Sequence, residues 1–175
     1  MRLEKFRVLN AVIASHPEGR VYGRTRLQKT ILLLQELGLP TDYRFSIYFY
    51  GPYSEGLTGD LHMLCDYGFA DEEKWQNLEG NPYSVFSAEL ESAPEVSEAI
   101  RPFKSAIERI SRGDNVALEL AATYVAYYDM CDGDQEQAMV RLQRKKGAKC
   151  TEENLQQAMA LLQDLGLPYA EEYAA

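Results

Sequence analysis

The sequence predicts a mainly α protein with a small β component: a winged-helix-like N-terminal module followed by C-terminal helices. Three observations lead to this class. Apolar residues recur at helical spacing along most of the 175 residues. An aromatic segment, YRFSIYFY at 43–50, interrupts the helices and reads as a strand. Residues 69–87 have the composition of a β-hairpin, which would be the wing.

The first helix is expected over residues 3–15, where Phe6, Leu9 and Val12 repeat at helical spacing. The segment 16–19 contains Pro and Gly and ends this helix. Val21 and Tyr22 would form a very short strand.

The second helix is expected over 24–37. Its apolar residues fall on one broad arc, and Arg24, Gln28 and Lys29 fall on the other side, which indicates an amphipathic helix with a solvated polar face. Gly38 is placed to cap its C-terminus in a left-handed conformation.

The strand at 43–50 is expected to break at Gly51-Pro52-Tyr53, after which Ser54 caps a third helix. Leu57, Leu61, Leu64 and Cys65 would face the core from that helix, which stops at Gly68. In the following hairpin, Phe69-Ala70 is assigned to the first strand and 83–86 to the second.

The remaining helices are expected near 94–112, 115–130, 135–146 and 152–165, capped in turn by Ser92, Asp114, Asp134 and Thr151. The chain thus divides into a winged-helix-like module at 1–91 and a helical region at 92–175 that packs on it. Residues 27–40 (LQKTILLLQELGLP) and 155–168 (LQQAMALLQDLGLP) agree at nine of fourteen positions. This similarity has two explanations: Leu-rich helices have converged, or a helical module has been duplicated.

Composition limits the function. The net charge of −9 weighs against a nucleic-acid partner, since an acidic chain is repelled by phosphate backbones unless its cations gather in one place. No apolar run is long enough for a signal peptide or a membrane span, so we expect a cytoplasmic protein with no membrane partner. Three widely spaced cysteines give neither a disulfide framework nor a metal knuckle.

No pattern for catalysis, metal or cofactor binding stands out. His62 and Cys65 are neighbours on one helix, but no third group orients them. The carboxylates in DMCDGD at 129–134 lack the spacing of a calcium loop, and Asp134 is better read as a helix cap. Phosphate-binding glycine motifs are absent. We therefore expect no enzyme, no metal and no cofactor.

The cations of the N-terminal half and the aromatics of the strand form the candidate contact site for a protein partner or an anion. These residues are Arg20, Arg24, Arg26, Lys29, Arg44, Tyr48, Tyr50 and Tyr53. A solvated helix face with ordinary ion pairs is the plainer reading of the cations. The third helix lacks Lys and Arg, which argues against the usual docking of a recognition helix in DNA. Tyr124, Tyr127 and Tyr128 could form a surface for self-association as a homodimer.

Two segments of the chain together resemble the YwgA-like group of bacterial and archaeal proteins: RLQKTILLLQELG and YRFSIYFYGPYSEGLTGDLHMLCDYGF. They resemble more distantly the Panacea-type antitoxin domain. The shared features are the Arg26-Leu27-Gln28-Lys29 helix, the aromatic strand and the Gly51-Pro52 turn; LELAATYVAYYD and TEENLQQAMALLQDLGL also look YwgA-like. The YwgA-like group is largely uncharacterised, whereas Panacea-type domains imply direct contact with a toxin.

We therefore expect a non-enzymatic protein-binding or regulatory module, antitoxin-like in the Panacea reading. The alternative is a DNA-binding transcriptional regulator that uses the basic face of the second helix or the wing.

Overall fold

The computed structural model describes residues 2–89 and 93–170. Helices dominate, joined by short antiparallel strands in two small sheets. The helices are α1 (Arg2–Ala14), α2 (Arg24–Glu36), α3 (Glu55–Asp66), α4 (Pro94–Ile100), α5 (Lys104–Arg112), α6 (Asn115–Met130), α7 (Gln135–Lys146) and α8 (Glu152–Asp164). The strands are β1 (Arg20–Tyr22), β2 (Ser46–Tyr48), β3 (Gly51–Tyr53), β4 (Asp71–Gln76) and β5 (Pro82–Ser87).

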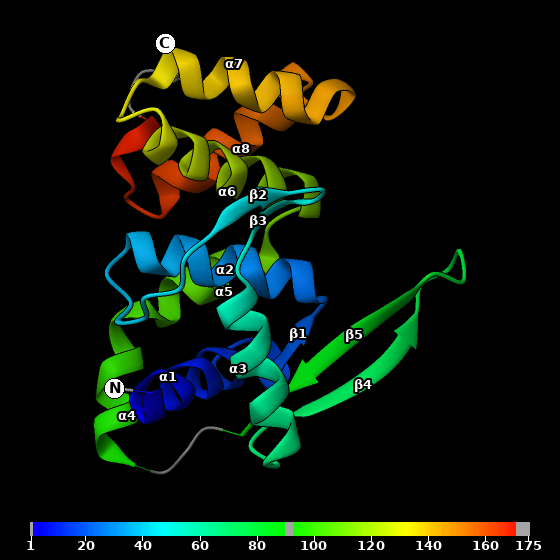
Figure 1. The fold of residues 1–175 in the computed structure, drawn as a ribbon, viewed down its shortest axis with the longest axis vertical. Coiled ribbons are helices and arrows are strands. Elements are labelled where there is room, and N and C mark those ends of the chain that lie inside the picture. The colour runs from blue at the N-terminus through cyan, green and yellow to red at the C-terminus, as the bar shows by residue number, and fades with distance from the viewer. Residues whose placement is uncertain (1, 90–92, 171–175) are drawn as a thin grey trace.

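The first sheet joins the start of the chain to the β4–β5 hairpin. Its order is β1-β5-β4, and β5 runs antiparallel to both neighbours. Val21 pairs with Phe86, which puts two buried side chains at the point where the sheet meets the helices. The outer part of the β4–β5 hairpin projects from the body of the protein (Figure 1).

The aromatic segment forms a hairpin rather than the single strand expected over 43–50. Only Ser46–Tyr48 is a strand, and it pairs antiparallel with Gly51–Tyr53, which was expected to break the strand. The register pairs Tyr48 with Gly51, leaving a two-residue turn at Phe49 and Tyr50. Gly51 has φ +102°, a conformation that favours glycine and starts the returning strand.

The first strand of the β4–β5 hairpin also begins later than expected. The backbone N–H groups of Phe69 and Ala70 both donate to the carbonyl of Leu64, so these two residues close α3. The strand instead consists of the charged sequence DEEKWQ at 71–76. This strand is mostly exposed on both faces, so it lacks the alternation by which sequence patterns reveal strands.

The single helix expected over 94–112 is divided in two. Pro102 lies in the short 3₁₀ turn Arg101–Phe103 that separates α4 from α5, because proline has no N–H for the helical ladder. The predicted cap Ser92 lies outside the described residues. Asp114, Asp134 and Thr151 do cap α6, α7 and α8, as predicted.

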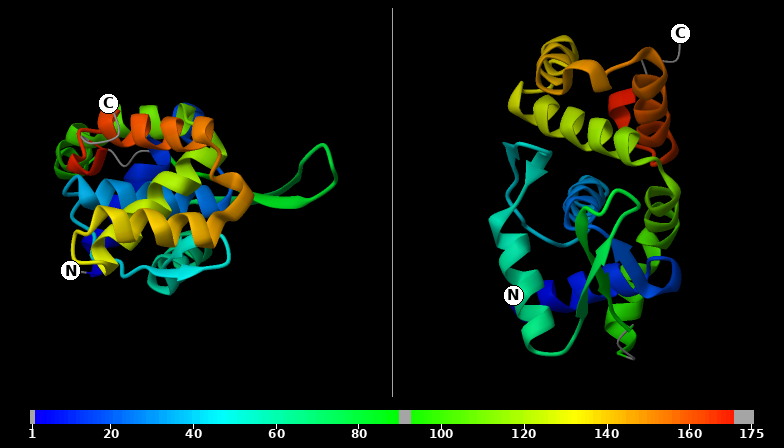
Figure 2. Two further views of the ribbon diagram at one scale, coloured as in Figure 1. Left: turned by 90° about the horizontal axis from the view of Figure 1, so that it is seen from above. Right: turned by 90° about the vertical axis from the view of Figure 1, so that its right-hand side faces the viewer.

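One hydrophobic core extends through the N-terminal and C-terminal helices. Helices α6, α7 and α8 gather at one end of the molecule, and α1 and α4 lie at the other, with α2 between them (Figures 1 and 2). Tyr124 is completely buried in this core, so the predicted self-association surface does not include it.

Candidate functional site

The middle of the polar side of α2, at Gln28 and Lys29, is buried, contrary to the sequence prediction. Gln28 is 5% exposed and its amide exchanges hydrogen bonds with the backbone of Ser54, accepting from the N–H at 2.8 Å and donating to the carbonyl at 3.0 Å. Gln35 binds the backbone of Tyr43 in the same way. The helical wheel could not show this, because the loop that covers α2 offers backbone groups rather than apolar side chains.

Arg26 holds α2 to the connection between α5 and α6. Its guanidinium donates to the carbonyls of Ile110 at 2.8 Å and Gly113 at 2.7 Å, and to the side chain of Asn115. Carbonyls at the end of α5 lack helical partners, so a guanidinium there satisfies them and complements the helix dipole. Arg26 is therefore a structural contact of the described fold.

A cluster of charges lies where α2, α6 and α7 meet, in which Lys29, Glu119 and Lys146 are buried and Lys149 is exposed. Glu119 of α6 accepts a hydrogen bond from Lys146 at 2.7 Å and from Lys149 at 2.9 Å. Burial would raise the pKa of Glu119, but the two lysines lower it below its ordinary value. Lys29 is only 4% exposed, and burial lowers its pKa to about 8 although the charge of Glu119 opposes this. One carboxylate thus serves a cluster with three ammonium groups.

Arg24 links the start of α2 to the β4–β5 hairpin. Its guanidinium donates to Glu72 at 2.8 Å, and Glu72 also accepts from Lys74 and Ser84 at 2.5 Å each. Burial would raise the pKa of Glu72, but hydrogen bonds from Lys74, Ser84 and Arg24 lower it to about 2. This network anchors the base of the hairpin.

The β2–β3 hairpin presents its aromatic side chains to solvent. Phe49 and Tyr50 in the turn are 84% and 71% exposed, and Tyr48 is 50% exposed. The rings of Tyr48 and Tyr53 lie 5.4 Å apart. Beneath the turn, a mainly apolar pocket of about 340 Å³ is bounded by these aromatics and by Arg24, Thr25 and Gln28 at the start of α2.

Gly51 seats this hairpin on α6. A Cβ at Gly51 would lie 2.7 Å from Oγ1 of Thr123 and 3.5 Å from Nζ of Lys146. Thr123 is fully buried and donates to the carbonyl of Glu119 at 2.6 Å. Only a glycine allows the backbone to come this close, so the β2–β3 hairpin packs directly against α6 at this point.

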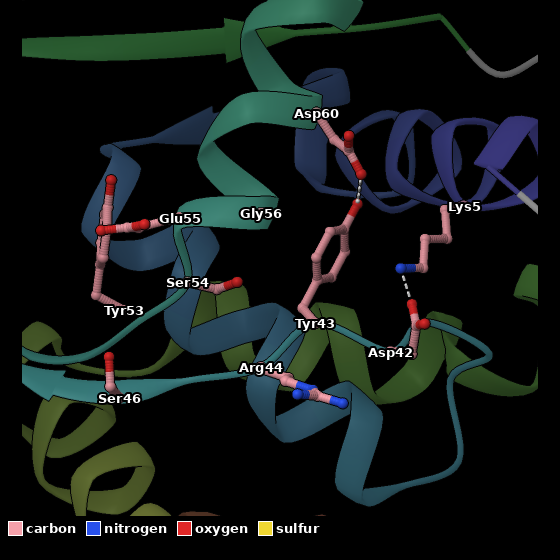
Figure 3. A pocket seen from close by; sticks show the side chains of 10 residues that line it. All are labelled: Lys5, Asp42, Tyr43, Arg44, Ser46, Tyr53, Ser54, Glu55, Gly56 and Asp60. Atoms are coloured by element: carbon pink, nitrogen blue, oxygen red, sulfur yellow. Dashed lines mark hydrogen bonds and ion pairs between the residues drawn. The ribbon is translucent and has the colours of Figure 1, made fainter.

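The other predicted cations lie elsewhere. Arg20 is half-buried in β1, and Arg44 is exposed in a second pocket, on the other side of the β2–β3 hairpin. In that pocket the hydroxyl of Tyr43 donates to Asp60 at 3.0 Å and Lys5 pairs with Asp42, while the guanidinium of Arg44 is joined to neither pair (Figure 3). The eight predicted residues therefore do not form one surface.

The sequence candidates for chemistry are also separated. His62 is exposed on α3, whereas Cys65 is partly buried. Burial raises the pKa of the Cys65 thiol, and Glu72, Asp66 and Asp71 raise it further, which is the opposite of what an activated thiolate needs. Within residues 2–89 and 93–170, no three His, Cys, Asp or Glu side chains gather as metal ligands. In the same ranges no helix has the length and apolar character to cross a bilayer.

Comparison with known proteins finds a relative that matches along most of the chain. The chain is 27% identical over 149 residues to the uncharacterised protein YwgA of Bacillus subtilis (strain 168). The alignment covers 84% of this chain and 89% of YwgA. The chain is YwgA-like. No family model matches it, and no solved structure matches it.

The structure gives the YwgA-like motifs a physical role. Each residue of the Arg26-Leu27-Gln28-Lys29 sequence lies against a different part of the protein. Arg26 contacts the α5–α6 connection and Leu27 lies in the core. Gln28 binds the backbone of Ser54, and Lys29 lies in the charge cluster around Glu119. Sequence reasoning missed Glu119. Its signal was available, because it is a lone acid within the apolar run LELAATYVA and such residues are buried only when paired.

Proposed function

We propose that the chain is a non-enzymatic protein-binding module on a winged-helix-like scaffold, and that its β2–β3 turn is the contact point. The observation that carries the proposal is the exposed turn of Tyr48, Phe49 and Tyr50 on a glycine-seated hairpin. Large exposed aromatics are typical of interface anchors, since rigid rings bury much area at little entropic cost. The pocket of about 340 Å³ beneath the turn suits an apolar side chain of the partner.

The order of the elements supports the winged-helix-like part of the proposal. A helix, a strand, two helices and a hairpin follow one another, and the last strand lies in the middle of the sheet. A winged helix has this connectivity. The β2–β3 hairpin is an additional element, inserted between the two helices α2 and α3. The proposed contact point is therefore an addition to the scaffold.

The alternative, a DNA-binding regulator, finds less support. Arg24 and Arg26 are engaged within the fold and Lys29 is buried. The wing strand β4 carries three acidic residues and one lysine, and α3 carries three acidic residues and no Lys or Arg. Phosphate contacts need accessible Lys and Arg, so both faces named by this alternative are poorly charged for it. The distant Panacea resemblance instead suggests a toxin as the protein partner.

Site-specific crosslinking in the native cell tests the contact point. A photo-crosslinking amino acid at Phe49 is expected to give one discrete protein adduct. The same amino acid at Val140, an exposed residue of α7, is the matched control and is expected to give none. The adduct should disappear when a Tyr48→Ser, Tyr50→Ser pair is added, and a toxin-like frame beside the gene would be the first candidate for its identity.

Equal crosslinking from Val140, or no adduct from Phe49, would contradict the proposed contact point. DNA binding is measured separately with duplex DNA at several salt concentrations. Tight binding whose affinity falls steeply with salt would favour the regulator instead. Arg44→Ala, which removes an exposed cation that is joined to neither the Tyr43–Asp60 nor the Lys5–Asp42 pair, then tests where the DNA lies.

A further inference from the structure

A third cavity, of about 510 Å³, lies between the start of α2, the β4–β5 hairpin and the start of α6. Lys29 and Glu119 line it on the side of the charge cluster. Tyr22 and Tyr83 line it on the side of the hairpin. It thus combines a charged wall with an aromatic one. The proposed contact point at the β2–β3 turn does not depend on this cavity.

The charged wall has an ammonium group without a partner. Lys29 is 4% exposed, and among the described residues it has neither a hydrogen bond nor an ion pair. Both oxygens of Glu119 are already taken by Lys146 and Lys149. Three ammonium groups thus surround a single carboxylate, so this wall carries an excess of positive charge.

The N-terminus of α2 opens on the same cavity. Gly23 precedes the helix with φ +106°, and no side chain caps it. Within the described residues, no acceptor is recorded for the backbone N–H groups of Arg24, Thr25 and Arg26. Gly23 and Thr25 line the cavity. N–H groups at the start of a helix, with the positive end of its dipole, bind anions.

We propose that this cavity binds a small phosphate monoester, whose phosphoryl group is held by Lys29 and the N-terminus of α2. A phosphoryl group brings close to two negative charges at neutral pH, which matches the excess of ammonium groups around Glu119. The volume exceeds what a phosphate alone would fill. Tyr22 and Tyr83, which line the cavity, supply aromatic surface for the organic part of the ester.

Calorimetric titration of the full chain with inorganic phosphate and with adenosine monophosphate tests the proposal. Both are expected to bind at pH 7, with the nucleotide tighter because it also contacts the aromatic wall. Lys29→Met keeps the length of the side chain and removes its charge, and it should weaken both affinities about tenfold or more. Lys145→Met removes an exposed cation of α7 that does not line the cavity and should leave both unchanged.

NMR titration of the unaltered chain adds a measurement that needs no variant. Phosphate should shift the backbone amide signals of Thr25 and Arg26 more than those of α8. Binding that survives Lys29→Met in a folded protein would overturn the proposal. So would the absence of heat and of amide shifts at about 10 mM of either probe, a concentration that largely fills even a site of millimolar Kd. Phosphate binding equal to that of the nucleotide would overturn the ester as ligand.

Discussion

Gly51 lies so close to Thr123 that a side chain does not fit: a Cβ there would be 2.7 Å from the threonine Oγ1. The φ of +102° adds strain for any other residue. We expect Gly51→Ala to lower the free energy of unfolding by about 2–4 kcal/mol. Chemical denaturation measures this directly.

Gly59→Ala is the matched control for that substitution. Gly59 lies inside α3, and nothing lies within 4 Å of a Cβ placed on it. Alanine is expected to stabilise the protein there by about 0.5–1 kcal/mol, since it reduces the freedom of the unfolded chain. Equal effects of the two alanines would show that the hairpin is not seated on α6.

Removing the buried carboxylate of Glu119 should destabilise the protein strongly. Glu119→Gln leaves Lys146, whose side chain is 3% exposed, without its ion-pair partner. Breaking such a buried pair costs about 3–5 kcal/mol. Urea denaturation at neutral pH measures the loss.

The double variant Glu119→Gln, Lys29→Met isolates the repulsion within that cluster. It should be more stable than Glu119→Gln alone, because one ammonium group is removed together with the carboxylate. If the loss of stability in the double variant equals the sum of the losses in Glu119→Gln and Lys29→Met, Lys29 is not coupled to Glu119.

Arg26→Lys should destabilise the protein although it keeps the charge. A lysine cannot reproduce the fork of donors that reaches Ile110, Gly113 and Asn115 together. We expect a loss of about 1.5–3 kcal/mol. Arg112→Lys, at a side chain that is 76% exposed in a surface ion pair, should change stability by less than about 0.5 kcal/mol. Thermal unfolding compares the two variants.

Acid should weaken the fold through His16. Burial lowers the pKa of His16 below 6.5, opposed by its hydrogen bond to the carbonyl of Val12. Because the unfolded chain binds the proton more readily, this contribution to stability is full above pH 6.5 and is lost as the pH falls below it.

His16→Gln should therefore flatten the dependence of stability on pH between about 7.5 and 5.5. His62→Gln, on the exposed side of α3, is the control for replacing a histidine by glutamine. The free energy of unfolding of each variant is measured across this range. A slope unchanged in His16→Gln would assign it to other groups.

Much of the fold was predictable because its signals are local. The side chains of Ser54, Asp114, Asp134 and Thr151 accept backbone hydrogen bonds at the predicted helix starts, and Gly38 has the predicted positive φ. These features depend on residues a few positions apart. The same reasoning found the exposed aromatics Tyr48 and Tyr50, although not the turn between two strands that exposes them.

The errors about the polar side of α2 concern distant contacts. Gln28 and Lys29 were placed on a solvated face because a helical wheel counts polarity and takes no account of what covers the helix. Gln28 is buried by a backbone 26 positions away, and Lys29 lies beside Glu119 of α6. The likeness of 27–40 to 155–168 also has limits: both segments end in the same glycine cap, but Gln156 and Gln157, which match Gln28 and Lys29, are exposed.

The position of α2 has a consequence for synthesis on the ribosome. The groups that cover Arg26 and Lys29 come from residues 110–119 and, around Glu119, from Lys146 and Lys149. When the first ninety residues have emerged, none of these partners exists yet. The nascent chain therefore carries an uncovered basic helix until the second half is made, and its final folding step has to wait for α6 and α7.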